Sequence, residues 1–134
     1  MFRIFFAALI VVACISGCGK KDGPETVKVA GTVNWNGEKL EAGDIQFIPA
    51  TNPSAKPYAA RIEKGAFALE LEPGPKKVMI TSSRDVPGKT IKDAIGKESP
   101  VREQFIPAKY NTSTTLQQSI ERPTSDLKFD LTEK

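Results

Sequence analysis

An alternation of apolar and polar residues limits this chain to β-structure more strictly than any other feature. In Val27–Trp35, apolar residues occupy every second position, the pattern of a half-buried strand. Asn36-Gly37 follows directly, and this dipeptide is a strong signal for a two-residue hairpin turn. Six further segments have strand patterns: Ile45–Ile48, Tyr58–Glu63, Ala66–Glu72, Lys76–Ser82, Thr114–Ile120 and Leu127–Leu131. Short strands separated by Gly and Pro predict an all-β fold, a single antiparallel β-sandwich of about seven strands.

The N-terminus has the layout of an export signal. Arg3 supplies a positive charge, and residues 4–13 (IFFAALIVVA) form an apolar run without any charge. A membrane-spanning helix needs about 20 apolar residues. This run is shorter and is soon followed by Lys20 and Lys21. A signal peptide therefore explains the run better than the alternative, a short membrane anchor that is never cleaved.

Residues 15–18 (Ile-Ser-Gly-Cys) resemble the lipobox of bacterial lipoproteins, in which an aliphatic and two small residues precede the modified cysteine. The resemblance implies that Cys18 receives a diacylglyceryl group with fatty acids such as palmitate. It also implies cleavage before Cys18, which frees an amine for further acylation. Two or more acyl chains anchor a protein stably, whereas one holds it only marginally. We therefore expect residues 1–17 to be a cleaved lipoprotein signal peptide and Cys18 to attach the chain to a membrane.

Residues 18–26 are expected to be the lipidated cysteine and its tether, because residues 19–26 are polar and aperiodic and contain two glycines and a proline. The folded domain then comprises residues 27–134. Gly19 stands where some lipoproteins carry an aspartate that retains them in the inner membrane. The expected location is therefore extracytoplasmic, with the outer membrane favoured. Because Cys14 is discarded and Cys18 is lipidated, the domain depends on a hydrophobic core without disulfides.

A series of short motifs spans most of the domain. They are residues 29–33 (VAGTV), 36–40 (NGEKL), 43–49 (GDIQFIP), 65–69 (GAFAL) and 73–78 (PGPKKV). The series is similar to carboxypeptidase-regulatory-like domains, which have a transthyretin-like β-sandwich. Residues 105–111 (FIPAKYN) and 127–131 (LKFDL) resemble a subset of small bacterial lipoproteins built on that module. Arg122-Pro123-Thr124 departs from the subset, which usually has a glycine in its last turn. These motifs imply an architecture rather than an activity.

The composition excludes several classes of function. The chain has no histidine, and its two cysteines lie at positions 14 and 18. It therefore lacks the residues for a peptidase zinc site, a Ser-His-Asp triad or a Cys-His pair. We predict no enzyme, no cofactor and no metal site. The formal charge of +3, without a basic stripe, argues against a nucleic-acid partner.

Residues 84–113 form the one long stretch without clean alternation. Long connections in a compact domain are usually functional or flexible. Ile91 and Ile95, followed by Gly96, predict one helical turn that lies on the sandwich. We place the candidate partner-binding surface within this stretch, at residues 86–103, and its candidate residues are the cations Arg84, Lys89, Lys92 and Lys97.

Two aromatic residues help to separate the candidate roles. Trp35 continues the inward register of Val29 and Val33, which predicts packing in the core or at its rim, whereas an exposed ring would suit stacking on a sugar. Pro107 favours an extended chain, so we expect a strand to follow, with Tyr110 directed inward and its hydroxyl bonded.

The sequence thus indicates a lipid-anchored, non-catalytic β-sandwich with a structural or protein-interaction role in the bacterial envelope. Its partner would be an envelope protein or polysaccharide that no sequence feature identifies. The alternative is a carbohydrate- or peptide-binding module of a larger envelope complex.

Overall fold

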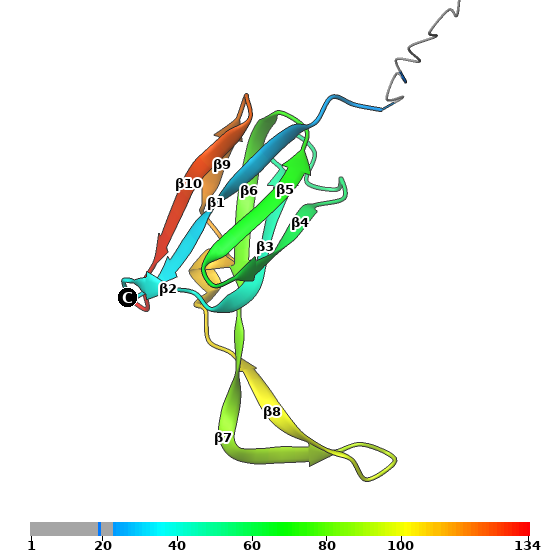
Figure 1. Cartoon of the computed structure of the whole chain (residues 1–134), viewed down its shortest axis with the longest axis vertical. Coiled ribbons are helices and arrows are strands. Elements are labelled where there is room, and N and C mark those ends of the chain that lie inside the picture. Colours follow the sequence, from blue (N-terminus) through cyan, green and yellow to red (C-terminus); the bar gives the residue numbers. More distant parts are fainter. Residues whose placement is uncertain (1–18, 20–22) are drawn as a thin grey trace, which may run out of the picture.

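The computed structural model describes residue 19 and residues 23–134 (Figure 1). Within them, ten strands and one short 3₁₀ helix follow each other along the chain. They are β1 Val27–Trp35, β2 Glu38–Lys39, β3 Ala42–Pro49, β4 Tyr58–Glu63, β5 Ala66–Leu71, β6 Gly74–Thr81, β7 Ser83–Lys92, β8 Glu98–Gln104, η1 Ala108–Tyr110, β9 Gln117–Ile120 and β10 Thr124–Leu131. This part of the chain has no helix long and apolar enough to cross a membrane. The predicted signal peptide and Cys18 lie outside the described residues.

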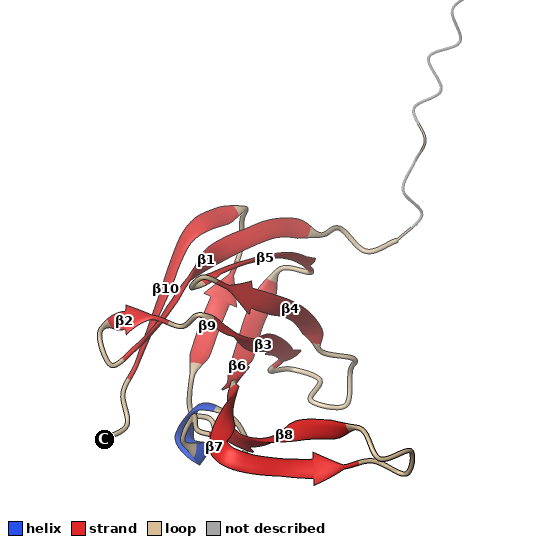
Figure 2. Cartoon of the chain, turned by 60° about the horizontal axis from the view of Figure 1, so that its bottom comes forward, coloured by secondary structure: helices blue, strands red, loops and turns tan. Residues whose placement is uncertain are grey.

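The body of the fold is a β-sandwich. Its strands follow the order β10-β1-β5-β4-β3-β6-β9. β4 and β5 pair only at Glu63 and Ala66, beside their turn, so the path divides there into two layers that face each other (Figure 2). Between the layers, the Phe47 ring of β3 lies 6.0 Å from the Phe67 ring of β5 and 6.4 Å from the Phe129 ring of β10. The all-β sandwich prediction is confirmed, and its seven segments correspond to these seven strands.

Two tight turns set the register of the sandwich. Asn36 and Gly37 have φ of 50° and 87°, and Lys64 and Gly65 have φ of 50° and 79°. Positive φ at both central residues defines the type I′ turn, whose twist matches that of the flanking strands. The hairpin predicted at Asn36-Gly37 is confirmed, since Trp35 pairs with Glu38 across it.

One strand pair departs from the antiparallel prediction. β10 runs parallel to β1, with Val33 opposite Phe129 and Trp35 opposite Leu131. Gly31 permits this approach, because a Cβ at that position would clash with the Leu127 carbonyl oxygen. Alternation predicts the buried face of a strand but not the direction of its neighbour, so the sequence could not show this parallel pair.

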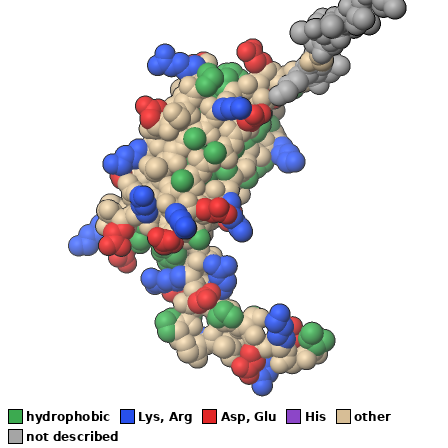
Figure 3. All heavy atoms as spheres, viewed as in Figure 1, with side chains coloured by type: hydrophobic (Ala, Val, Ile, Leu, Met, Phe, Trp, Pro, Cys, Tyr) green, Lys and Arg blue, Asp and Glu red, His purple; other side chains and the backbone are tan. Residues whose placement is uncertain are grey.

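β7 and β8 form a separate two-stranded ribbon that projects from one end of the sandwich (Figures 1 and 3). We call residues 83–104 the arm. The helical turn predicted over Ile91 and Ile95 is wrong, because Ile91 belongs to β7 and pairs with Ser99 of β8. The cause is that nearly every arm residue is exposed on both faces. Without a buried face, a strand has no alternation to reveal it.

The connection after the arm also differs from the prediction. Pro107 is extended, with φ of −57° and ψ of 150°, but the helix η1 follows it instead of a strand. The side-chain amide of Asn111 stabilises this turn. Its nitrogen donates to the carbonyl oxygens of Ile106 and Pro107, both at 3.1 Å. Asn111 is buried, so these bonds replace the water contacts that the amide and the carbonyls lose.

Candidate functional site

The tether and the arm lie at opposite ends of the molecule. Residues 23–26 are exposed and lead into β1 at one end of the sandwich, whereas β7 and β8 leave from the other (Figure 1). Cys18, the predicted lipidation site, lies outside the described residues. If the chain is anchored through Cys18, the arm is the part farthest from the membrane.

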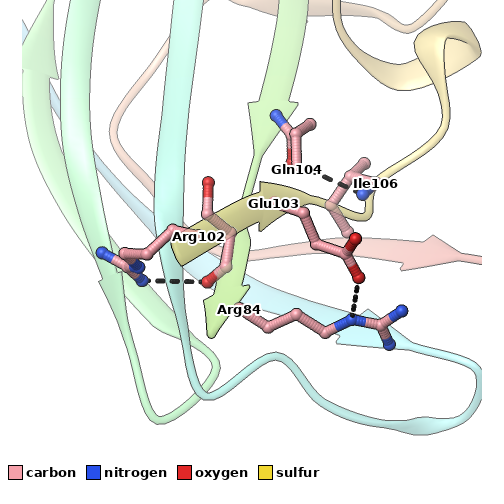
Figure 4. A network of polar contacts seen from close by, with 6 residues as sticks. Arg84, Arg102, Glu103, Gln104 and Ile106 are labelled. Carbon is pink, nitrogen blue, oxygen red and sulfur yellow. Dashed lines mark hydrogen bonds and ion pairs between the residues drawn. The ribbon is translucent and has the colours of Figure 1, made fainter. Parts of the chain in front are cut away.

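The foot of the arm is the junction at which its two strands leave the sandwich. Hydrogen bonds around Ser82 hold this junction in place. The Ser82 hydroxyl donates to the Ala42 carbonyl oxygen at 2.5 Å. The Ser82 amide donates to Gln104 Oε1 at 2.9 Å. The Ile106 amide donates to the same oxygen at 3.4 Å (Figure 4). The Phe105 amide returns a bond to the Ser82 carbonyl at 3.2 Å. These contacts hold both strands of the arm at its exit from the sandwich.

An aromatic contact reinforces the foot. The ring centroids of Trp35 and Phe105 are 5.6 Å apart at an interplanar angle of 72°, the edge-to-face arrangement that aromatic pairs favour. The guanidinium carbon of Arg84 lies 5.3 Å from the Phe105 centroid. Trp35 is half-buried and packs against the core, which confirms the predicted rim packing. Its edge contact with Phe105 argues against an open platform for a sugar ring.

The four predicted cations are spread along the arm and do not form one basic patch. Arg84 Nε lies 3.0 Å from Glu103 Oε1 (Figure 4), and Lys92 Nζ lies 3.2 Å from Glu98 Oε1. In the part of the chain that the structure describes, Lys89 and Lys97 have no carboxylate within ion-pair distance. Both signs of charge therefore alternate over the arm (Figure 3), which does not favour a polyanionic partner.

A bend divides the arm into two halves. Near the foot, Asp85 pairs with Arg102, and in the distal half, Thr90 pairs with Pro100. Between them β7 contains extra residues, including Gly88 with φ of 73°. A bulge of this kind bends a strand. The distal half consequently runs across the long axis of the molecule (Figure 1).

The tip of the arm is an ordered turn that displays an isoleucine. Asp93 Oδ1 accepts bonds from the amides of Ile95 at 3.0 Å and Lys97 at 2.9 Å, and Gly96 has φ of 81°. Ile95 is 87% exposed, and Ile91 in the adjoining strand is 61% exposed. Sequence reasoning expected both side chains to cover the sandwich. The turn residues Asp93 and Gly96 were the signal that could have placed Ile95 at a hairpin tip.

The surface also has two hollows, one on the sandwich and one where the arm meets it. A shallow apolar hollow of about 510 Å³ has Ala30, Ala68 and Pro123 in its lining. A polar one of about 310 Å³, at the foot of the arm, includes Asp44, Arg61 and Arg102. Within the described residues, no group of His, Cys, Asp and Glu side chains could hold a metal ion.

Comparison with known proteins finds no matching family model and no matching curated protein. A DUF3823 family protein from Parabacteroides merdae ATCC 43184 is similar over 81% of this chain and 47% of its own, with 16% identity and a TM-score of 0.43. A 9R-lipoxygenase from Cyanothece PCC8801 is similar over 80% of this chain and 16% of its own, with 9% identity and a TM-score of 0.41. The chain thus spans less than half the length of either structure.

Proposed function

We propose that this protein is a lipid-anchored, non-catalytic interaction module of the bacterial envelope, and that the arm is its binding surface. In this proposal Cys18 holds the chain on the extracytoplasmic side of the membrane, with the outer membrane favoured, and the sandwich is of the carboxypeptidase-regulatory-like kind. The observation that carries the proposal is the position of the arm, which leaves the sandwich at the end opposite the tether.

The exposure of the arm supports a binding role. The buried hydrophobic core includes no residue of 83–104, so the arm does not contribute to the interior of the sandwich. An isolated two-stranded ribbon is marginally stable in water. Covering an exposed isoleucine stabilises a complex by about 1.5–3 kcal/mol, and the distal half offers two, Ile91 and Ile95.

The side chains of the arm favour a protein partner over a carbohydrate. Arg84, Lys92 and Arg102 are paired with carboxylates of the arm itself, which reduces the attraction for an anionic polysaccharide. The apolar side chains at the distal end instead suit an apolar protein surface. The sugar-binding alternative would need an open aromatic face, and Trp35 is half-buried beside Phe105.

Photo-crosslinking in intact host membranes tests this role. A photoreactive residue replaces Ile95 in the full chain, and the matched control replaces Thr32, which is exposed on β1 of the sandwich. We expect a discrete covalent adduct from position 95 and none from position 32. Equal labelling at the two positions, or no adduct at position 95, would show that the arm is not the binding surface.

A further inference from the structure

We propose that the distal half of the arm pairs with the same segment of a second copy of this chain, edge to edge through β7 and in an antiparallel register centred on Ile91. This inference rests on the proposed role of the arm as a binding surface, and it names the partner. Four features of the distal half support it: its hydrogen-bonding edge, its charge pattern, its orientation and its lack of a covering layer.

The outer edge of β7 presents backbone groups to solvent. The Asp93 amide donates to the Lys97 carbonyl oxygen at 3.0 Å, so Asp93 faces β8. Inward and outward positions alternate along an antiparallel ladder. Ile91, opposite Ser99, therefore also directs its amide and carbonyl toward β8. Thr90 and Lys92 direct theirs outward, where another strand can accept and donate.

The other edge of the ribbon is blocked. Pro100 of β8 lies opposite Thr90, so it also occupies an outward position, and proline has no amide hydrogen to offer. Prolines at such positions are a usual protection of an edge strand. β7 carries no proline between Thr90 and Lys92, so the pairing edge of the distal half is that of β7.

The charges of β7 are self-complementary in this register. Centring on Ile91 places Ile91 opposite its own copy and Thr90 opposite Lys92 of the second copy. Lys89 then lies opposite Asp93 of the second copy, and the two-fold symmetry creates this pair twice. Alternate residues share a face, so both charge pairs flank the isoleucine pair on one face. Opposite charges and apolar pairs across strands are each stabilising.

The bend in the arm allows two paired copies to be anchored in the same membrane. The distal half runs across the long axis of the molecule (Figure 1). A two-fold axis along that long axis pairs the two β7 strands in antiparallel fashion and leaves both tethers on the same side. Two-fold dimers are the commonest symmetric assemblies. The product is a four-stranded sheet with the isoleucine pair on one face, and three or more strands with an apolar face are what an isolated hairpin lacks for independent stability.

Disulfide formation between single cysteines tests the register. The background is the full chain in detergent with Cys14→Ser and Cys18→Ser, which removes both natural cysteines. Ile91→Cys is compared with Ile95→Cys. In the proposed register the two copies of position 91 form a non-hydrogen-bonded pair with Cα atoms about 4.5 Å apart, within the range for a disulfide. Copies of position 95 do not face each other.

We expect the Ile91→Cys dimer to form at least about tenfold faster than the Ile95→Cys dimer under mild oxidation, although Ile95 is the more exposed residue (87% against 61%). Equal rates, or a faster reaction at position 95, would show random collision and overturn the register. If Ile91→Cys fails to pair while position 95 labels another protein in membranes, the dimer is wrong and the proposed binding role stands.

Charge reversal supplies a second measurement, by sedimentation of the same full chain with its natural isoleucines. Lys89→Glu places like charges opposite each other twice, so the dimer association constant should fall about tenfold. Lys56→Glu makes the same charge change at an exposed residue of the loop between β3 and β4, outside the arm, and should leave the constant unchanged. An equal effect of both variants, or none from Lys89→Glu, contradicts the register.

Discussion

The surroundings of the two tyrosines of the chain shift their pKa values in opposite directions. Tyr110 is half-buried against the core, and its hydroxyl accepts a bond from the Thr132 amide at 3.1 Å. The hydroxyl bond expected from the sequence is confirmed, and its partner Thr132 directly follows β10. The main cause that lowers the pKa of Tyr110 is the contact of its hydroxyl with the Thr132 side-chain hydroxyl, at 3.5 Å. The Thr132 amide and Lys109 lower it further. Tyr58 has a raised pKa, because burial disfavours its phenolate and Glu72 lies beside it.

A spectrophotometric titration of the full chain, which contains two tyrosines, should therefore resolve two steps around the ordinary pKa of 10.0. Tyr110→Phe should remove the earlier step, and Tyr58→Phe the later one. The signs for stability follow by linkage. The contribution of Tyr58 is present below the unfolded-state pKa and is lost as pH rises through its raised pKa. The contribution of Tyr110 is present above the unfolded-state pKa and is lost as pH falls through its lowered pKa.

The opposite assignment of the two steps, with the earlier one lost in Tyr58→Phe, would contradict the causes of the two pKa shifts, which are Thr132 and Lys109 beside Tyr110, and burial and Glu72 at Tyr58. A single unresolved step that neither variant alters would do the same.

Among the elements, the arm is the one that can be shortened without removing a residue of the buried hydrophobic core. Replacing residues 86–101 by Asn-Gly keeps the pair of Asp85 with Arg102 and closes the strands with a two-residue hairpin turn. None of the buried hydrophobic residues lies in the excised segment, and the exposed Lys92–Glu98 pair that is lost is worth at most about 1 kcal/mol. We expect one cooperative transition and a free energy of unfolding within about 1 kcal/mol of the intact chain.

Denaturant unfolding followed by the fluorescence of Trp35, the single tryptophan, measures this directly. Trp35 packs beside the foot of the arm, so its emission also reports whether the foot is preserved. A loss of cooperativity, or a destabilisation of several kcal/mol, would show that the arm is part of the folding unit.

The elements also show what alternation can and cannot predict. The strands of the sandwich have one buried face, so Val29 and Val33 in β1, or Phe67 and Leu71 in β5, mark them in the sequence. The strands of the arm have no buried face, and no period marked them. The turn at η1 depends on the buried amide of Asn111, a tertiary contact that has no local signal.

The candidate site was predictable only in its location. The sequence placed four cations in one long segment, but the pairing of Arg84 with Glu103 and of Lys92 with Glu98 depends on the register of a hairpin. That register includes a bulge between Asp85 and Thr90, and bulges are not visible in an apolar pattern. The exposure of Ile91 and Ile95 follows from the same hairpin.

At the scale of the whole molecule, the fold separates the N-terminal segment from the arm. The chain enters the sandwich at one end through an exposed segment, residues 23–26, and the arm leaves at the other (Figure 1). The eight residues between Cys18 and Val27 extend to about 26–29 Å at most. An anchor at Cys18 would therefore hold the sandwich close to the bilayer and direct the arm away from it.

This arrangement predicts that Cys18→Ala releases the protein from the membrane without unfolding it. Cys18 precedes the first strand, and the buried core begins at Val29, so the variant loses no packing in the core. It loses the acyl chains, which contribute about 0.8 kcal/mol of membrane binding per buried CH₂. Fractionation after a high-salt wash, which screens electrostatic attachment, measures the anchor, and denaturant unfolding measures the fold. Cys14→Ala is the matched control and should stay with the membrane, because the lipobox places Cys14 in the discarded segment. A Cys18→Ala chain that remains in the membrane fraction at the level of the unmodified chain would refute the lipid anchor at Cys18. The exposed segment at the end of the molecule opposite the arm would then need a different role.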